Sequence, residues 1–421
     1  MAWLGDANKY PTLTLEVGFA SASSGFGVWD DSASLWDDAN WGPDIVWTDL
    51  SSRVCGVRLE RSVAPETGQA AVGTMQVQLR NNDGELTPAN TSGTYVAGGV
   101  SQIRARVPVR LRATWNGTTY DLFRGRATSW RDTFPQTGKE CVTVLDVVDL
   151  WADLGNIALA AVSATGSGDA AGDRILRIAN ASNWSTGVDI DAGRNTMQAT
   201  TYGATAAVLA QLTADSDGGL VFADGAGNLV FHDYYRRFTG SRSIAAQMTL
   251  GGAGVAFRDE SVSNDDDGMA NVVRYTRVDG TAQESRSAES VALNGERTLE
   301  RADLICETDA QALAVADLVV LTRATPGYAV DGLTVWPVRD PSTVWPLALD
   351  AKFDDYHDVT ITHPGGFTIN RKVFVVGIAH DISLDQGWSV SFTYTSATPY
   401  AAFWGDAFWD AGTWDTSSWF I

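Results

Sequence analysis

The chain has 421 residues, of which 44% are hydrophobic and 19% charged, with 41 glycines and 12 prolines. This length predicts about two to four folded domains, and the composition excludes a disordered, collagen-like or coiled-coil chain. The 51 acidic residues outnumber the 30 basic ones, and the net charge of −21 argues against nucleic-acid binding as a function. Passage of DNA along the protein without specific binding remains compatible with that charge.

Neither a membrane span nor a signal peptide is predicted. No stretch approaches the ~18 consecutive apolar residues of a membrane helix, and Met1–Tyr10 has neither a basic start nor an apolar run. The three cysteines form no C-x-x-C pair, so neither a disulfide framework nor a zinc site is indicated. We expect them to be buried as small hydrophobic residues; they are Cys55, Cys141 and Cys306.

The first third of the chain, after an N-terminal arm, shows the alternation typical of β-strands. Apolar and polar residues alternate through residues 107–113, and Asn116-Gly117 then supplies the turn that two-residue hairpins prefer. Residues 49–145 are therefore predicted to form a small antiparallel β domain. Pro108 has no backbone N–H, which predicts an edge position for its strand.

Helical patterns are sparse and begin in the middle of the chain. Residues 146–154 and 204–212 each predict a short helix. Residues 220–233 predict two short apolar strands about a Gly-rich turn. These elements define a predicted α+β middle domain over residues 146–265.

The clearest helix is predicted over residues 309–323. Thr308 can cap its first turn, and Pro326-Gly327 follows its end. Further strand patterns on both sides of the helix predict a second β domain over residues 266–398, followed by a C-terminal tail, residues 399–421. The predicted fold class is α+β, predominantly β, in several units whose helices cover sheets.

Turn and strand motifs follow one another in a definite order along residues 45–398. They are N-D-G-E-L-T-P at Asn82–Pro88, P-V-R-L-R at Pro108–Arg112, F-R-G at Phe123–Gly125, the hairpin at residues 218–237 and the strands around residues 358–397. In this order and spacing they resemble the minor tail proteins of siphophages that infect actinobacteria. The hairpin ending at residues 232–235 departs from the pattern commonest in that family.

The resemblance implies a fold similar to the baseplate hubs of contractile-tailed phages. Residues 49–145 and 266–398 would then be two barrel-like β domains, and three subunits would form a ring around a channel for DNA and the tape-measure protein. The expected assembly is a homotrimer at the tail tip of the virion, made in the host cytoplasm. Its expected partners are the distal tail protein, the tape-measure protein and other minor tail proteins, acting in host attachment and genome ejection.

No catalytic or metal-binding motif is present in the sequence. The four histidines lie in no H-E-x-x-H motif and beside no G-x-S-x-G serine, so turn or core roles are expected for them; they are His232, His357, His363 and His380. The acidic stretches Asp215–Gly218 and Asn264–Gly268 do not fit an EF-hand and predict solvated loops, with an irregular calcium site left open. We therefore predict no catalytic residue, no metal, no cofactor and no enzymatic activity.

Tryptophan is concentrated near the two ends of the chain, in the Trp- and Asp-rich arm over residues 1–48 and in the Trp-repeat tail. The candidate docking residues are Trp29, Trp36, Trp41 and Trp47 near the start and Trp404, Trp409, Trp414 and Trp419 at a five-residue interval near the end. A period of five matches neither helix nor strand, so a turn-rich repeat is predicted. These side chains could pack on the chain itself, dock a neighbouring tail protein or bind cell-wall glycan.

Two other functions remain open at this point. A carbohydrate-binding module that recognises host cell-wall glycan is favoured only by the tryptophans. A cell-wall hydrolase is favoured only by the abundance of carboxylates, because the spatial separation of a catalytic pair cannot be read from a sequence.

Overall fold

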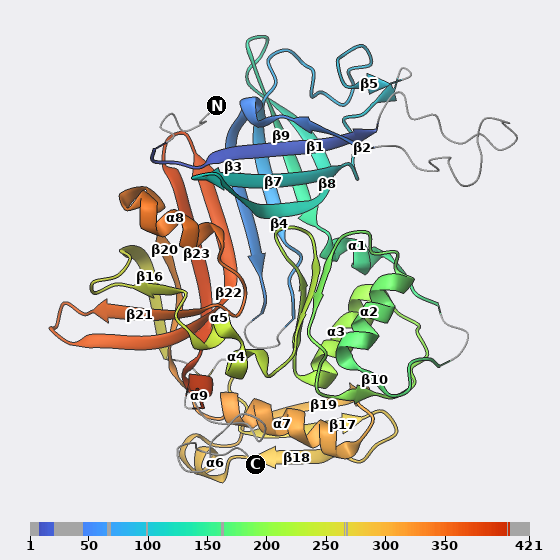
Figure 1. Ribbon diagram of the computed structural model, residues 1–421, viewed down its shortest axis with the longest axis vertical. Helices are drawn as coiled ribbons and strands as arrows, with labels where there is room; N and C mark the ends of the chain where they lie inside the picture. Colours follow the sequence, from blue (N-terminus) through green and yellow to red (C-terminus); the bar gives the residue numbers. More distant parts are fainter. Residues whose placement is uncertain are drawn as a thin grey trace, which may run out of the picture.

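The computed structural model describes residues 8–20, 45–64, 69–97, 100–160, 164–264, 266, 268–401 and 403–404. Within them a 13-stranded sheet dominates, and two smaller parts that contain most of the helices lie beside and below it (Figure 1). The predicted class, α+β and predominantly β, is confirmed.

The large sheet takes strands from both ends of the chain. Its first group is β1 (Thr12–Ala20), β2 (Ile45–Asp49), β3 (Val54–Ser62), β4 (Thr74–Arg80), β7 (Pro108–Trp115), β8 (Thr118–Gln136) and β9 (Glu140–Asp149). Its second group is β15 (Met248–Leu250), β16 (Phe257–Asn264), β20 (Tyr328–Val335), β21 (Tyr356–Thr362), β22 (Thr368–Ser383) and β23 (Gly387–Ser396). The main path runs β16-β20-β23-β22-β3-β4-β9-β8-β7-β1-β2, with β15 and β21 attached beside β22.

The two groups meet where β22 pairs antiparallel with β3, with Ile378 opposite Arg61 and Ile382 opposite Val57. Two separate closed barrels are therefore not confirmed, because this pairing merges the two halves into one sheet whose path among the described strands is open. The backbone N–H and C=O groups on the free edge of β3 bond to β22, and not to a strand of the first group.

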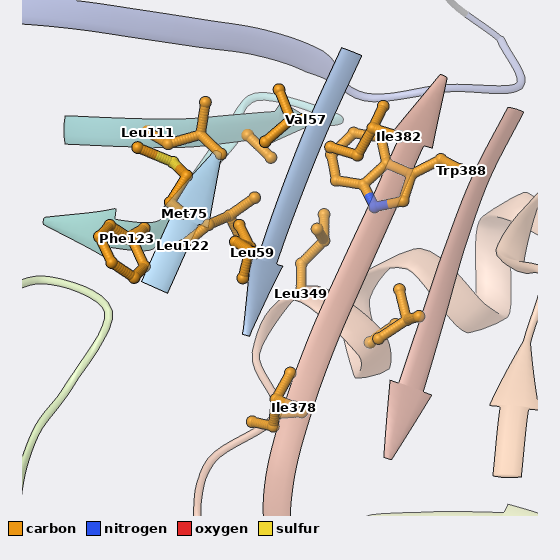
Figure 2. Close-up of a cluster of buried hydrophobic side chains, with 14 of the residues drawn as sticks. Val57, Leu59, Met75, Leu111, Leu122, Phe123, Leu349, Ile378, Ile382 and Trp388 are labelled. Carbon is orange, nitrogen blue, oxygen red and sulfur yellow. The ribbon is translucent and has the colours of Figure 1, made fainter. Parts of the chain in front are cut away.

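Alternation along the strands buries one face of the sheet. Strand β4 alternates strictly between exposed and buried residues, with Met75, Val77 and Leu79 buried. Figure 2 shows side chains from both halves in one cluster, with Met75 on one side, Trp388 on the other and Leu59 between them. One hydrophobic core thus spans both groups of strands, and helix α8 (Pro341–Leu349) covers part of it.

The predicted hairpin at Asn116-Gly117 is confirmed. Trp115 pairs with Thr118, and the two turn residues have φ angles of 48° and 83°, as a tight two-residue hairpin requires. The prediction of an edge strand at Pro108 was wrong. Strand β1 pairs with the other side of β7, and Pro108 is tolerated because it is the first residue of its strand.

Two segments near the first β group differ from the sequence-based prediction. Residues 12–20, expected within the N-terminal arm, form β1 and join the sheet. Residues 146–149, expected at the start of a helix, continue β9, and helix α1 (Trp151–Asn156) begins only after them. Pairing of β9 with β4 and β8 on both sides outweighs the local helical pattern.

The middle part combines helices with short strands. Its helices are α2 (Ala171–Ala181), α3 (Ala206–Asp217), α4 (Arg236–Thr239) and α5 (Ser241–Ile244), and its strands are β10 (Asp169–Ala170), β11 (Val188–Ile190), β12 (Thr196–Met197), β13 (Leu220–Ala223) and β14 (Leu229–His232). The predicted hairpin is β13–β14, and the predicted second helix is α3. The hairpin turn lies against β8, because a Cβ on Gly225 would stand 2.4 Å from the carbonyl oxygen of Asp121. Only glycine permits this approach.

The third part is a three-stranded sheet covered by one long helix. It consists of β17 (Val272–Arg277), β18 (Gln283–Arg286), β19 (Thr298–Leu304), α6 (Ala288–Asn294) and α7 (Asp309–Arg323). The prediction of α7 is confirmed, and Thr308 and Gln311 form a capping box at its start. The remaining short elements are the 3₁₀ turns at Ser51–Arg53 and Pro337–Arg339, β5 (Val96–Ala97), β6 (Val100–Ser101) and α9 (Thr398–Ala401).

Candidate functional site

The outer face of the large sheet is polar over six adjacent strands, from β23 to β8. Strand register places one row of side chains across it, namely Ser389, Asp381, Arg58, Gln76, Asp146 and Ser129. The next row of residues along the strands points to the opposite side and contributes Leu59, Met75, Val147 and Val390 to the core. The sheet therefore buries one face, and its other face presents a continuous polar row across six strands.

The charged side chains of this row form ion pairs. Arg58 pairs with Asp381 at 2.7 Å, and Arg131 pairs with Asp146 at 2.9 Å. The Asp146 carboxylate also accepts hydrogen bonds from Gln76 and Ser129, and these contacts hold its pKa below the ordinary value although partial burial acts to raise it. In this row the face presents hydrogen-bonded polar groups rather than free cations.

A buried ion-pair cluster joins the middle part to the large sheet. Asp354, just before β21, contacts His232 Nδ1 at 2.8 Å and Arg237 Nε at 2.8 Å. Burial would raise the pKa of Asp354, but the charges of Arg237 and His232 outweigh burial and hold it far below its ordinary value. Next to it, Arg242 binds both carboxylate oxygens of Asp355 at 2.6 Å. A bidentate Arg–carboxylate contact fixes orientation as well as distance, so this cluster sets how the two parts meet.

The remaining histidines have structural roles, as the sequence predicted. Burial lowers the pKa of His357 and of His380 to about 3, so both rings are neutral. His357 contacts the hydroxyl of Tyr394, and His380 accepts a hydrogen bond from Trp388 Nε1. His363 stacks on Phe367 in the β21–β22 turn. Among the residues that the structure describes, no group of His, Cys, Asp and Glu is arranged to hold a metal ion.

The acidic stretch at Asp215 is not the solvated loop that the sequence predicted. Asp215, Ser216 and Asp217 form the last turn of α3, which ends at Gly218 in the left-handed conformation. Asp217 is fully buried and accepts hydrogen bonds from two backbone N–H groups, while Asp215 pairs with Arg301 at 2.6 Å. In the second stretch, residues 265 and 267 lie outside the described residues.

Two of the eight candidate tryptophans are described, and both contact their own chain. The Arg110 guanidinium lies 4.2 Å from the centre of the Trp47 ring, in a cation–π arrangement. The Trp404 ring packs against Tyr356 at 4.6 Å, and its Nε1 donates a hydrogen bond to the carbonyl oxygen of Arg237 at 3.1 Å. The other six lie outside the described residues, and they are Trp29, Trp36, Trp41, Trp409, Trp414 and Trp419.

Sequence analysis missed the Asp354 cluster and the outer polar row. No motif marks either, since each joins residues that are far apart in the chain, such as Arg58 and Asp381 with a separation of 323 residues. The available signals were only local, namely strand alternation with polar residues on one side and the unusual run of acids at Asp354-Asp355. The three cysteines are unpaired, with Cys141 and Cys306 buried and Cys55 half-buried.

This architecture, one continuous sheet with a helical insertion, is shared with solved phage tail proteins. The 43 kDa tail protein of prophage MuSo2 from Shewanella oneidensis is 14% identical, with a TM-score of 0.57 over 93% of this chain and 99% of that one. The tail protein from Neisseria meningitidis MC58 is 12% identical, with a TM-score of 0.55 over 94% of this chain and 99% of that one. At these identities the likeness shows a common fold. No protein-family model and no curated protein sequence matches the chain.

Proposed function

We propose that this chain is a structural minor tail protein that forms the hub at the tail tip of a siphophage infecting actinobacteria. Two observations support the proposal. The fold is shared with two phage tail proteins over nearly the whole of both chains, and the order of the turn and strand motifs resembles the minor tail proteins of actinobacterial siphophages. The proposed location is the virion tail tip.

The outer polar face carries the more specific proposal of a ring. A sheet that buries one face in its own core and keeps the other polar over six strands can form one segment of a channel wall. Closed rotational symmetry is the usual way for identical subunits to surround a channel. We propose a homotrimer whose outer faces point to the channel, with the barrel-like character of each half completed by the neighbouring subunits.

Passing DNA would meet little resistance at such a wall. Protein–DNA affinity arises mainly from Lys and Arg side chains that neutralise phosphates. Arg58 and Arg131 on this face are paired with carboxylates, which weakens their attraction for the DNA backbone, whereas Arg80 on the same side of β4 is exposed. The distal tail protein, the tape-measure protein and other minor tail proteins are the proposed partners, and the terminal tryptophans are the proposed docking residues.

The chain is proposed to have no enzymatic activity. The described histidines are bound in structural contacts, and the buried carboxylate Asp354 is compensated by Arg237 and His232. The glycan-binding alternative rested on the tryptophans, and one of them, Trp404, packs against the chain itself. We therefore put forward no second function.

The ring can be tested in the intact particle and in solution. Light scattering of the purified chain is expected to give the mass of a trimer, and a cryo-EM map of the tail tip is expected to show three copies around the channel. A single copy per tail tip would contradict the ring.

The channel-facing surface can be tested by adding cations to it. Gln76→Arg combined with Ser129→Arg places two arginines in the row and should slow DNA ejection while the particles still assemble. Ser185→Arg, at an exposed position in the middle part, is the matched control and should eject at the parental rate. Equal ejection rates for all three particles would contradict the assignment of this face.

A further inference from the structure

A polar cavity lies where the large sheet, the middle part and the segment after α8 meet. Its volume is about 360 Å³, near the lower end of the range of small-molecule sites. The floor is formed by β3 and β22, and the walls by the β13–β14 hairpin, α5 and residues 348–355. The Asp354 cluster forms part of this wall. Arg61 and His380 also line the cavity and do not belong to that cluster.

Arg61 on β3 lies on the floor without a hydrogen-bonding partner among the described residues. Its Nε is buried and has no acceptor, and no described residue accepts a hydrogen bond from its guanidinium. The guanidinium lies over the Phe353 ring at 5.7 Å, and the nearest carboxylates, Asp149 and Asp224, act on it only through space. A guanidinium has five N–H donors that are costly to leave unsatisfied in a half-buried position. Arg61 is therefore available to an acceptor that enters the cavity.

His380 on β22 supplies a second donor beside Arg61. Register places Arg61 opposite Ile378, so His380, two residues further along β22, lies on the same face of the sheet. Indole Nε1 can only donate, so its hydrogen bond to Nδ1 of His380 fixes the neutral ring with its proton on Nε2. Nε2 has no partner among the described residues, and His380 lines the cavity.

The entrance of the cavity has the opposite character. Asp121 and Asp189 line it, and both side chains are exposed and form no ion pair with a described residue. The inner carboxylates of Asp354 and Asp355 are already held by Arg237 and Arg242. Lys352 also lines the cavity and is exposed, so its outer part carries the two carboxylates of Asp121 and Asp189 and one cation, while Arg61 lies at the floor. Because the carboxylates outnumber the cation there, this entrance favours a ligand whose carboxylate is accompanied by an ammonium group over a simple anion.

We propose that this cavity binds an amino-acid-type zwitterion, with its carboxylate on the Arg61 guanidinium and His380 Nε2–H and its ammonium group toward Asp121 and Asp189. The same chemistry is presented by a free amino acid and by the end of a peptide chain that terminates in lysine. This binding site is inferred from the cavity residues alone and does not depend on the proposed ring.

Calorimetric titration of the full chain with L-lysine tests the site directly. Lysine is expected to bind. L-lysinamide lacks the carboxylate, so its affinity is expected to be lower by about tenfold or more, as for the loss of a charge-assisted hydrogen bond. Arg61→Gln should abolish the preference for lysine over lysinamide. Arg58→Gln, on the same strand but on the outer face, is the matched control and should bind lysine like the parent.

A double variant at the entrance keeps the test valid if Arg61→Gln fails to fold. Asp121→Asn with Asp189→Asn changes only exposed residues and should weaken lysine binding while strengthening the binding of acetate. The tripeptide Gly-Gly-Lys distinguishes the sources, since tighter binding than free lysine indicates a peptide end and weaker binding a free amino acid. Absence of lysine binding to the parent, or equal binding of lysine and lysinamide, would overturn the proposal.

Discussion

His232 and Asp354 are separated by 122 residues in the sequence, yet His232 Nδ1 and Asp354 Oδ2 lie 2.8 Å apart at a buried junction. The pair ties the end of β14 to the segment before β21, and Arg237 completes it from α4. The arrangement of the middle part on the large sheet therefore depends on a carboxylate that neither part could bury alone.

Asp354→Asn should destabilise the chain by about 1.5 to 3 kcal/mol, because it leaves the half-buried Arg237 guanidinium without its carboxylate partner. Chemical denaturation followed by tryptophan fluorescence measures the loss. Asp350→Asn is the matched control, since Asp350 also pairs with an arginine but its side chain is 48% exposed, and it should cost less than about 1 kcal/mol. Equal losses in the two variants would show that burial is not what makes the Asp354 pair important.

Gly117→Val should cost about 1 kcal/mol or more, because Gly117 has φ of 83° and a β-branched residue is strained there. No atom lies within 4 Å of a Cβ built on Gly117, so the cost is one of backbone conformation and not of crowding. Gly155→Ala, in α1 with equally free space, should be neutral or slightly stabilising. A parental denaturation midpoint for Gly117→Val would refute the turn geometry.

Asp149→Asn should flatten the dependence of stability on pH. Burial raises the pKa of Asp149 from 3.8 to about 7, against the lowering effects of backbone N–H groups and Arg61. Between these values the native chain binds a proton that the unfolded chain does not, so the free energy of unfolding falls as the pH rises from about 4 to about 7. The loss in unfolding free energy from pH 5 to pH 8 should therefore be smaller in Asp149→Asn than in the parent.

Asp146→Asn provides the control for this pH effect. The pKa of Asp146 lies below its ordinary value, so its carboxylate is ionised throughout the interval from pH 5 to pH 8 in both the folded and the unfolded chain. The variant is expected to be less stable than the parent by a constant amount, with an unchanged slope. A parental slope in Asp149→Asn would instead assign the pH dependence to other buried carboxylates such as Asp217, whose pKa is raised to about 6.

Deletion of residues 405–421 should leave the core folded and impair incorporation into tails. The truncation has to begin after Trp404, because Tyr400 is buried and Trp404 packs against Tyr356. Trp404→Ala alone is expected to cost about 1 to 3 kcal/mol. Thermal melting separates the two effects, and infectious particles of normal yield that carry the truncated chain would contradict an assembly role for the tail.

Local signals in the sequence were enough to predict the β7–β8 turn and helix α7. Asn116-Gly117 and Thr308 act through their own backbone and immediate neighbours, so the surrounding fold has little influence on them. The strand at residues 146–149 was missed because its hydrogen bonds go to β4 and β8. The position of Pro108 inside the sheet was missed for the same reason, since its covering strand β1 lies about ninety residues earlier.

The candidate sites were harder to predict than the elements. The outer row joins up across both halves only when β22 pairs with β3. The Asp354 cluster forms only when the middle part packs against the segment before β21. Polar residues at alternate strand positions predict a solvated face, but they do not reveal that several such faces join into one.

Pairing of β22 with β3 also determines when the chain can finish folding during synthesis. Arg58 and Asp381 are 323 residues apart, and at ~5–20 residues per second a ribosome needs about 15 to 65 s to make the intervening chain. Throughout that interval the β3 edge that faces β22 has no partner, and the apolar side chains of Val57 and Leu59 lack Ile382 and His380 opposite them. Production of the intact protein therefore depends on protecting an early strand until a late one emerges, and slower translation should increase aggregation of the nascent chain.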